Sequence, residues 1–201
     1  MKVVHLNNAD TSGGAAIAAF RIHQSLLNRG LHSRMWVNNA QSGDWTVSGP
    51  DGKWKKAAAQ IRRHLISPAL KTLQTKNKIL HSPAILPSSW SKKFNQSDLD
   101  IAHLHWVGAE MASISDIGRI KKPVVWTLHD MWAFCGAEHI SWDQRWREGY
   151  TRKNRPSDEA GLDINRLTWN RKLKHWKQPF HVVAVSKWLA ECAQNSVVMR
   201  D

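Results

Sequence analysis

The sequence lacks the features of membrane-spanning and exported proteins. Its 201 residues contain no run of about 18 apolar residues, which a transmembrane helix would require. The N-terminal segment 1–7 is too short and turns polar too soon to be a signal peptide. We therefore expect a cytoplasmic protein that attaches, at most, peripherally to the inner face of the plasma membrane.

Cysteine is scarce, with only Cys135 and Cys192 in the chain. The two residues lie far apart in sequence and suggest no disulfide framework. A structural zinc site of the usual cysteine-rich kind needs more cysteines than the chain contains. The cysteine count therefore predicts neither a disulfide framework nor a cysteine-rich structural zinc site.

Acidic residues and tyrosine are also few. The 16 Asp and Glu residues stand against 29 Lys and Arg, which gives a formal net charge of +13. Such a charge attracts nucleic acid, anionic lipid or a phosphorylated substrate. Tyr occurs once and Phe four times, whereas Trp occurs 12 times. Trp is favoured at membrane–water interfaces and stacks on sugar faces, so we expect the charge to serve more than solubility.

The pattern of apolar residues predicts one α/β domain over residues 1–201. A strand at 2–7, a turn-rich loop, a helix at 15–28 and a strand at 33–38 open the chain. This order is typical of a Rossmann-like domain with a mostly parallel, doubly wound sheet. The other elements expected are an amphipathic helix at 53–67, strands at 100–106, 123–128 and 180–185, and helices at 110–119, 157–177 and 186–195. The basic segment 53–97 interrupts this alternation of strands and helices. The segments 39–52, 82–97 and 131–154 are expected to be irregular.

Distinctive residues follow four of the predicted strands. Ligands of open parallel sheets bind beyond the carboxyl ends of the strands, where such residues converge. The groups expected at this edge are Gly13, Gly14, His103, His105, Trp106, His129, Asp130, Ser186 and Lys187.

The pair Gly13-Gly14 lies between a strand and a helix. Two glycines there let backbone N–H groups approach a ligand beside a helix N-terminus, which favours anions. The pair is not the G-x-G-x-x-G fingerprint, so a dinucleotide site is not expected. The alternative is a tight turn with no ligand.

His129 and Asp130 are the predicted catalytic pair. A histidine at a strand end can bind a sugar hydroxyl or a phosphate oxygen, and the adjacent carboxylate can orient it. Thr127 before the pair and Trp132 after it strengthen this prediction. The alternative is a capping aspartate beside an incidental histidine.

His103 and His105 are two residues apart on one strand and therefore face the same side. Such a pair can bind zinc, and His129, Asp130 and His139 could complete a set for a metal-dependent hydrolase. The alternative is that His103 packs in the core and only His105 is functional.

The expected helix at 53–67 has an apolar face and a basic face. It could lie on an anionic membrane with Trp54 at the interface, or grip nucleic-acid phosphates. It could equally dock its apolar face on its own domain. The residues proposed to contact membrane or anion are Lys53, Trp54, Lys55, Lys56, Arg62 and Arg63.

Four segments together resemble a known enzyme family in order and spacing. They are residues 10–16 (Asp-Thr-Ser-Gly-Gly-Ala-Ala), 100–106 (Asp-Ile-Ala-His-Leu-His-Trp), 124–132 (Val-Val-Trp-Thr-Leu-His-Asp-Met-Trp) and 183–190 (Val-Ala-Val-Ser-Lys-Trp-Leu-Ala). The chain is similar to the N-terminal domain of GT-B glycosyltransferases of family 4, of the bacterial exopolysaccharide and colanic-acid type. The region 53–90 matches least.

The resemblance implies a retaining glycosyltransferase with two Rossmann-like domains around a cleft and generally no metal. The N-terminal domain receives the acceptor, a glycan or lipid-linked glycan, and the C-terminal domain binds the nucleotide-sugar, which is a co-substrate rather than a cofactor. His129 would contact the transferring sugar. The other residues that would bind substrate are Gly13, Gly14, His105, Trp106, Thr127, Trp132 and Ser186.

The sequence departs from the family in two respects. Relatives often carry several cysteines after the His-Asp-Met-Trp segment, whereas here Cys135 stands alone and is followed by Glu138 and His139. The donor-binding domain would begin at about Asp201, and no second glycine-rich strand–helix unit replaces it. We therefore expect this half-enzyme to be inactive without a C-terminal domain, which would be either a separate polypeptide or a part missing from this chain.

The sequence supports three hypotheses of function. The first is the acceptor-side glycosyltransferase domain, and the second is a non-catalytic basic module that binds anionic membrane or a lipid-linked glycan. The third is the metal-dependent hydrolase. Nucleic-acid binding comes last, since no known nucleic-acid module is visible.

Overall fold

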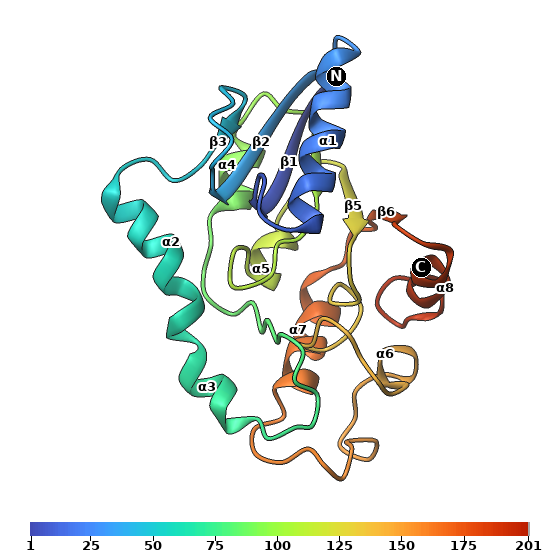
Figure 1. Ribbon diagram of the computed structural model, residues 1–201. Helices are drawn as coiled ribbons and strands as arrows, with labels where there is room; N and C mark the ends of the chain where they lie inside the picture. Colours follow the sequence, from blue (N-terminus) through green and yellow to red (C-terminus); the bar gives the residue numbers. More distant parts are fainter. Residues whose placement is uncertain (201) are drawn as a thin grey trace.

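A computed structural model describes residues 1–200; Asp201 and the side chain of Arg63 lie outside its description. Within residues 1–200 the fold is α/β, with a six-stranded parallel sheet in the order β3-β2-β1-β4-β5-β6, as expected of a Rossmann-like domain (Figure 1). The strands are β1 (Lys2–Ala9), β2 (His32–Asn39), β3 (Val47–Ser48), β4 (Ile101–Leu104), β5 (Val124–Leu128) and β6 (His181–Ala184).

The two faces of the sheet differ in chemistry. One face carries the main apolar core, to which the central strands β1, β4 and β5 contribute Val4, Leu6, Ala102, Leu104, Trp126 and Leu128. On the opposite face, helix α1 (Gly14–Asn28) packs Ala19 against Met35 and Val37 of β2. Alternation along β1, β4 and β5 places polar side chains on this second face. The histidines of the central strands therefore lie on the α1 side of the sheet.

The remaining helices are mostly short. They are α2 (Lys53–Leu65), α3 (Ser67–Thr72), α4 (Trp90–Asn95), α5 (Ile114–Ile117), α6 (Arg145–Glu148), α7 (Ile164–His175) and α8 (Lys187–Asn195). Helices α2 and α3 form an arm that extends along one side of the molecule (Figure 1). In the described part of the chain, no helix is both long and apolar enough to cross a bilayer.

Several predicted boundaries are wrong, and each has an identifiable structural reason. The helix expected at 110–119 begins only at Ile114, because Ala109 and Glu110 have φ of 50° and 61°. The helix expected at 157–177 begins at Ile164, because Ala160 forms an antiparallel bridge with Gln74. Pro68 does interrupt the amphipathic helix, but it also lies in the first turn of α3, where proline is tolerated. The short elements β3, α4 and α6 were not predicted.

A polar network holds the segment 131–163. Arg145 makes two hydrogen bonds to Glu159, at 3.0 and 2.6 Å, and the Tyr150 hydroxyl donates to Glu138. The fully buried Lys172 of α7 donates to the backbone carbonyls of Trp132, Cys135 and Gly136. Burial lowers the pKa of Lys172 to about 7. The segment is thus fixed by hydrogen bonds and charge.

Candidate functional site

The predicted site residues follow the carboxyl ends of the central strands. Strands β1, β4 and β5 are parallel neighbours, so the residues after Ala9, Leu104 and Leu128 lie at one edge of the sheet. Here the structure joins His105 to His129, with 3.2 Å between Nδ1 of His105 and Nε2 of His129. It also joins Trp106 to Asp130 through the indole N–H, at 2.9 Å.

His129 is half-buried and has one ring nitrogen available. Its Nε2 is engaged by His105, and Nδ1 has no hydrogen-bond partner within residues 1–200. Burial lowers the pKa of His129, although the charge of Asp130 opposes this effect. A neutral imidazole with one free nitrogen can make a single hydrogen bond to a hydroxyl or phosphate oxygen.

Asp130 is held from three directions. Its Oδ1 accepts from the backbone N–H of Trp132 at 2.9 Å, and Oδ2 lies 2.6 Å from Nδ1 of His139 and 2.9 Å from the Trp106 indole nitrogen. Burial by itself would raise the pKa of Asp130, but the hydrogen bond and charge of His139, with the other donors, lower it. Its carboxylate is therefore ionised, and it is held by the side chains of His139 and Trp106 and by the backbone N–H of Trp132.

His139 continues this chain of contacts to Ser82. Its Nε2 lies 2.8 Å from the Ser82 hydroxyl, which also accepts from the Ala109 N–H at 2.9 Å. The order serine–histidine–aspartate is that of a nucleophilic triad. However, Ser82 is only 1% exposed, so a substrate carbonyl has no direct approach to its oxygen. The arrangement serves here to fix Asp130 and His139.

Two residues of this site, Ser82 and Gly108, were not predicted from the sequence. A Cβ atom on Gly108 would lie 2.8 Å from Cε1 of His139, so the backbone passes too close to the ring for any side chain. No local pattern marked either residue, because each matters only through its contact with His139.

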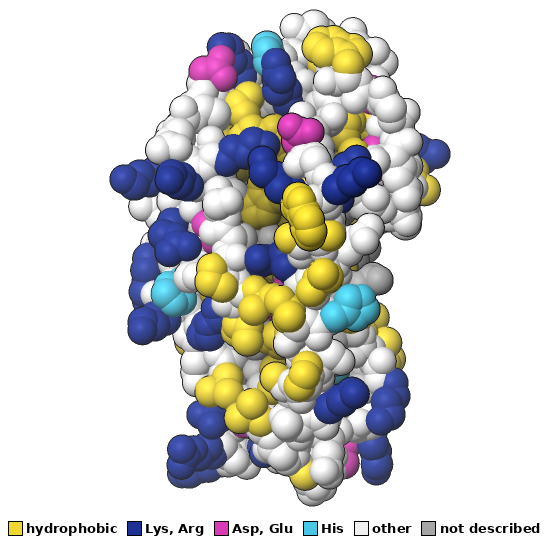
Figure 2. Space-filling model, turned by 90° about the vertical axis from the view of Figure 1, so that its left-hand side faces the viewer, with side chains coloured by type: hydrophobic (Ala, Val, Ile, Leu, Met, Phe, Trp, Pro, Cys, Tyr) yellow, Lys and Arg dark blue, Asp and Glu magenta, His cyan; other side chains and the backbone are white. Residues whose placement is uncertain are grey.

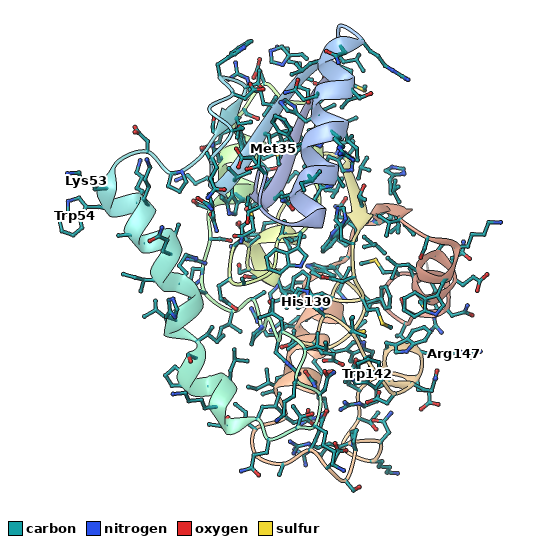
Figure 3. All side chains as sticks on the ribbon, viewed as in Figure 1. Met35, Lys53, Trp54, His139, Trp142 and Arg147 are labelled. Carbon is teal, nitrogen blue, oxygen red and sulfur yellow. The ribbon has the colours of Figure 1, made fainter. Side chains whose placement is uncertain are left out.

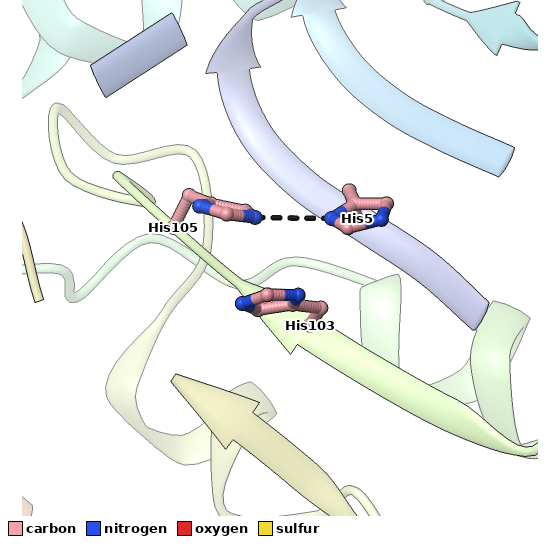
Figure 4. Close-up of side chains that lie close together, drawn as sticks. All are labelled: His5, His103 and His105. Carbon is pink, nitrogen blue, oxygen red and sulfur yellow. Dashed lines mark hydrogen bonds between the residues drawn. The ribbon is translucent and has the colours of Figure 1, made fainter. Parts of the chain in front are cut away.

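Three histidines, the buried His5 and His105 and the half-buried His103, form a trio on the α1 side of the sheet (Figure 4). His105 links this trio to His129. One ring nitrogen from each residue lies within 4.8 Å of the others, which is close enough to consider a metal ion. The structure does not gather into one site all the residues that the sequence suggested as metal ligands of a hydrolase. His103 and His105 lie with His5, which was not among the predicted ligands, whereas Asp130 and His139 form a separate pair.

The other predicted residues have identifiable contacts. Thr127 bonds His103 at 2.8 Å, Trp132 is 3% exposed and donates to the Ser82 carbonyl, and Ser186 caps α8 by accepting from the Leu189 N–H. Gly14 begins α1. Gly13 precedes it with φ of 93°, a conformation that favours glycine, and the space beside both is open. Their substrate contacts stay a prediction.

Two cavities meet at Trp106. The smaller, of about 10 Å³, is lined by His105, His129, Asp130 and His139 and has room for about one water molecule. The larger is a groove of about 1020 Å³ between the strand ends and the α2–α3 arm. Its lining includes Asn8, Asn38, Lys56, Gln60, Ile61, Leu70, Leu80, Ser82 and Trp106.

The α2–α3 arm does not bury its apolar face on the domain. Trp54, Ile61 and Leu65 are 90%, 51% and 62% exposed. The side chains of Lys53 and Trp54 point away from the body, whereas His139 lies inside it (Figure 3). Figure 2 shows Lys and Arg side chains around apolar ones on the face that includes the arm. The alternative that α2 docks its apolar face on its own domain is therefore wrong.

Arg62 has a different role from the exposed lysines of α2. Its guanidinium donates to the backbone carbonyls of Leu86 and Pro87, both at 2.8 Å, and of Glu110 at 2.9 Å. Lys55 and Lys56 are exposed, and the predicted contact of Arg63 concerns a side chain outside the described residues. Arg62 therefore anchors the arm to the domain.

Comparison of the chain with protein-family models, with curated proteins and with solved structures finds no match.

Proposed function

We propose that the chain is the acceptor-side domain of a retaining glycosyltransferase. It would move a sugar from a nucleotide-sugar to a glycan or lipid-linked acceptor, together with a donor-binding domain. The observation that carries this proposal is the groove at the carboxyl edge of the sheet. It reaches Trp106, which belongs to the same edge as His129, the residue with the free ring nitrogen.

The groove has the chemistry of an amphiphilic acceptor site. Asn8 and Asn38 supply amide groups for sugar hydroxyls, and Trp106 supplies an indole next to them. Ile61 and Leu70 of the arm supply apolar wall for a lipid chain. These features support an acceptor that has a polar head and an apolar tail.

In the proposed reaction the acceptor hydroxyl replaces the nucleoside diphosphate at the anomeric carbon on the same face of the sugar, which retains the configuration, and the proton of the hydroxyl passes to the departing diphosphate. The diphosphate would be held mainly by the donor-binding domain, with the basic charge of this chain assisting. His129 would orient the transferring sugar through its free ring nitrogen. Asp130 would hold Trp106 and His139 in place. No residue of the site is proposed as a covalent nucleophile.

Acceptor binding by the chain tests this proposal. A polyprenyl-diphosphate-linked monosaccharide in detergent micelles is expected to bind, and nucleotide-sugars are expected to bind weakly or not at all, by isothermal titration. Gln60→Trp, which fills the groove, should abolish glycolipid binding. The matched substitution Gln194→Trp, at an exposed position of α8 that does not line the groove, should leave it unchanged. Tight nucleotide-sugar binding, or full glycolipid binding by Gln60→Trp, would contradict the proposal.

A second candidate function is peripheral binding to anionic membrane through the arm. It is favoured by the exposure of Trp54 beside Lys53, Lys55 and Lys56. We expect sedimentation with phosphatidylglycerol vesicles that weakens as salt is raised, and several-fold weaker binding by Trp54→Ala. The surface residue Trp142, which is 74% exposed and lies outside the arm, provides the control variant Trp142→Ala. Absence of binding even at low salt would remove this candidate.

A further inference from the structure

The histidine trio arises from the register of the two central strands. His103 and His105 are two residues apart and project from the same face of the sheet. His5 of β1 lies directly beside His103 in the parallel pairing, so its ring joins them (Figure 4). The three rings are packed closely, with centroids 4.8 Å apart for His5 and His103 and 4.2 Å apart for His103 and His105.

The spacing of the ring nitrogens approaches that of metal ligands. Tetrahedral Zn²⁺ has Zn–N bonds of about 2.0–2.1 Å, which places two ligand nitrogens roughly 3.3 Å apart. Nδ1 of His5 and Nε2 of His105 are 3.0 Å apart, and one nitrogen of His103 completes a set within 4.8 Å. A ring movement of up to roughly 1.5 Å by His103 would bring all three to coordination distance.

The outer nitrogens of two rings have partners of the kind that orient metal ligands. Nε2 of His103 is 2.8 Å from the Thr127 hydroxyl, and Nδ1 of His105 is 3.2 Å from Nε2 of His129. Histidine ligands usually use their second nitrogen in this way, which fixes the ring and its proton. Nε2 of His105, which faces His5, and the second nitrogen of His103 are then the atoms available to an ion.

The rings are ready to bind a cation at neutral pH. His5 and His105 are almost fully buried, which disfavours the protonated, charged form of their rings. Neutral imidazoles offer lone pairs without competition from protons. His103 is only half-buried, so an ion could enter from its side.

We propose that His5, His103 and His105 form a binding site for a borderline first-row divalent cation such as Zn²⁺. Three imidazoles without a carboxylate select such ions over Mg²⁺ and Ca²⁺, which prefer oxygen ligands. The ion would tie β1 to β4. It would also place the remaining proton of His105 on Nδ1, facing His129. The role is structural and is independent of the proposed sugar transfer.

Metal binding by tag-free, chelator-treated protein tests this site. After incubation with excess Zn²⁺ and gel filtration, elemental analysis should give about one ion per chain, and Mg²⁺ should not bind. Co²⁺ should give the visible absorption of a four-coordinate site, with three imidazole nitrogens and a water molecule as ligands. Zn²⁺ should also raise the melting temperature, because the three histidines are brought together only in the folded chain.

Matched histidine variants locate the ion. His103→Gln keeps a polar side chain near Thr127 but should lose the Zn²⁺, the Co²⁺ spectrum and the thermal shift, whereas His32→Gln at the opposite edge should keep all three. Circular dichroism of His103→Gln without metal checks that it folds. Substoichiometric Zn²⁺ in the wild type, or equal Zn²⁺ in His103→Gln, would overturn the proposal. Loss of the ion in an Asp130→Asn variant alone would assign it to the other pair instead.

Discussion

Substitution of Gly108 by alanine tests how tightly His139 is held. The new methyl carbon would lie 2.8 Å from Cε1 of His139 and 3.1 Å from both Nε2 of that ring and the Ser82 hydroxyl. The ring cannot yield easily, because both nitrogens are hydrogen-bonded, to Ser82 at 2.8 Å and to Asp130 at 2.6 Å.

Two estimates bound the effect of Gly108→Ala on stability. If the ring stays, overpacking costs about 1–3 kcal/mol. If the ring moves, the chain loses one neutral and one charge-assisted hydrogen bond, together about 2–4 kcal/mol. We therefore expect the free energy of unfolding to fall by about 2–3 kcal/mol, measured by urea denaturation with Trp fluorescence.

Two further variants separate this contact from a general effect of adding a methyl group. Gly14→Ala in the first turn of α1 meets no atom within 4 Å and should be neutral or stabilising by up to about 1 kcal/mol. In a double-mutant cycle, Gly108→Ala should cost little once His139→Ala has removed the ring. Equal effects of Gly108→Ala in both backgrounds, or equal stability of the two alanine variants, would refute the reasoning.

Three other predictions follow from single contacts. Arg62→Ala removes three hydrogen bonds, so chymotrypsin should cleave the 53–72 arm about tenfold faster. The control Lys55→Ala should not change the cleavage rate. Equal rates for the two variants would contradict the anchoring role of Arg62. The pKa of Asp130 is lower in the folded chain than in the unfolded chain, where it is about 3.9, so its ionisation stabilises the fold above that pH. This stabilisation is lost as the pH falls through the pKa of the folded state. Asp130→Asn should therefore make the free energy of unfolding depend less on pH in the acid range. An unchanged pH dependence in that range would argue against an ionised Asp130. Ser186→Ala removes the cap of α8 and should cost about 1 kcal/mol in urea unfolding; a cost below about 0.3 kcal/mol would show that the cap contributes little.

The fold class could be predicted because its elements are locally encoded. The apolar strands β1, β4, β5 and β6 lie within about two residues of their expected ranges, and α1 differs by one residue. The elements that were missed or shifted depend on distant contacts. The bridge from Ala160 to Gln74 delays α7, and the positive φ values before α5 have no marker in residues 109–110.

The candidate site was predicted only in part. His129 and Asp130 follow a strong strand, which is a local signal, and the structure places them at the expected edge. Their partners were harder to find, because His105 is 24 residues from His129 and Ser82 is 57 residues from His139. The arm illustrates the same limit, since its amphipathic pattern was clear but only the structure shows that Trp54 and Leu65 remain exposed.

The sequence by itself determined the α/β class, the strand ends that carry polar residues and the basic, amphipathic character of α2. These follow from periodicity and charge, which act over a few residues. Tertiary structure alone decided which histidines meet. His5 and His105 are 100 residues apart and share a hydrogen bond because β1 and β4 pair in parallel with His5 beside His103. Strand pairing sets such contacts, and no local pattern records which strand will be the neighbour.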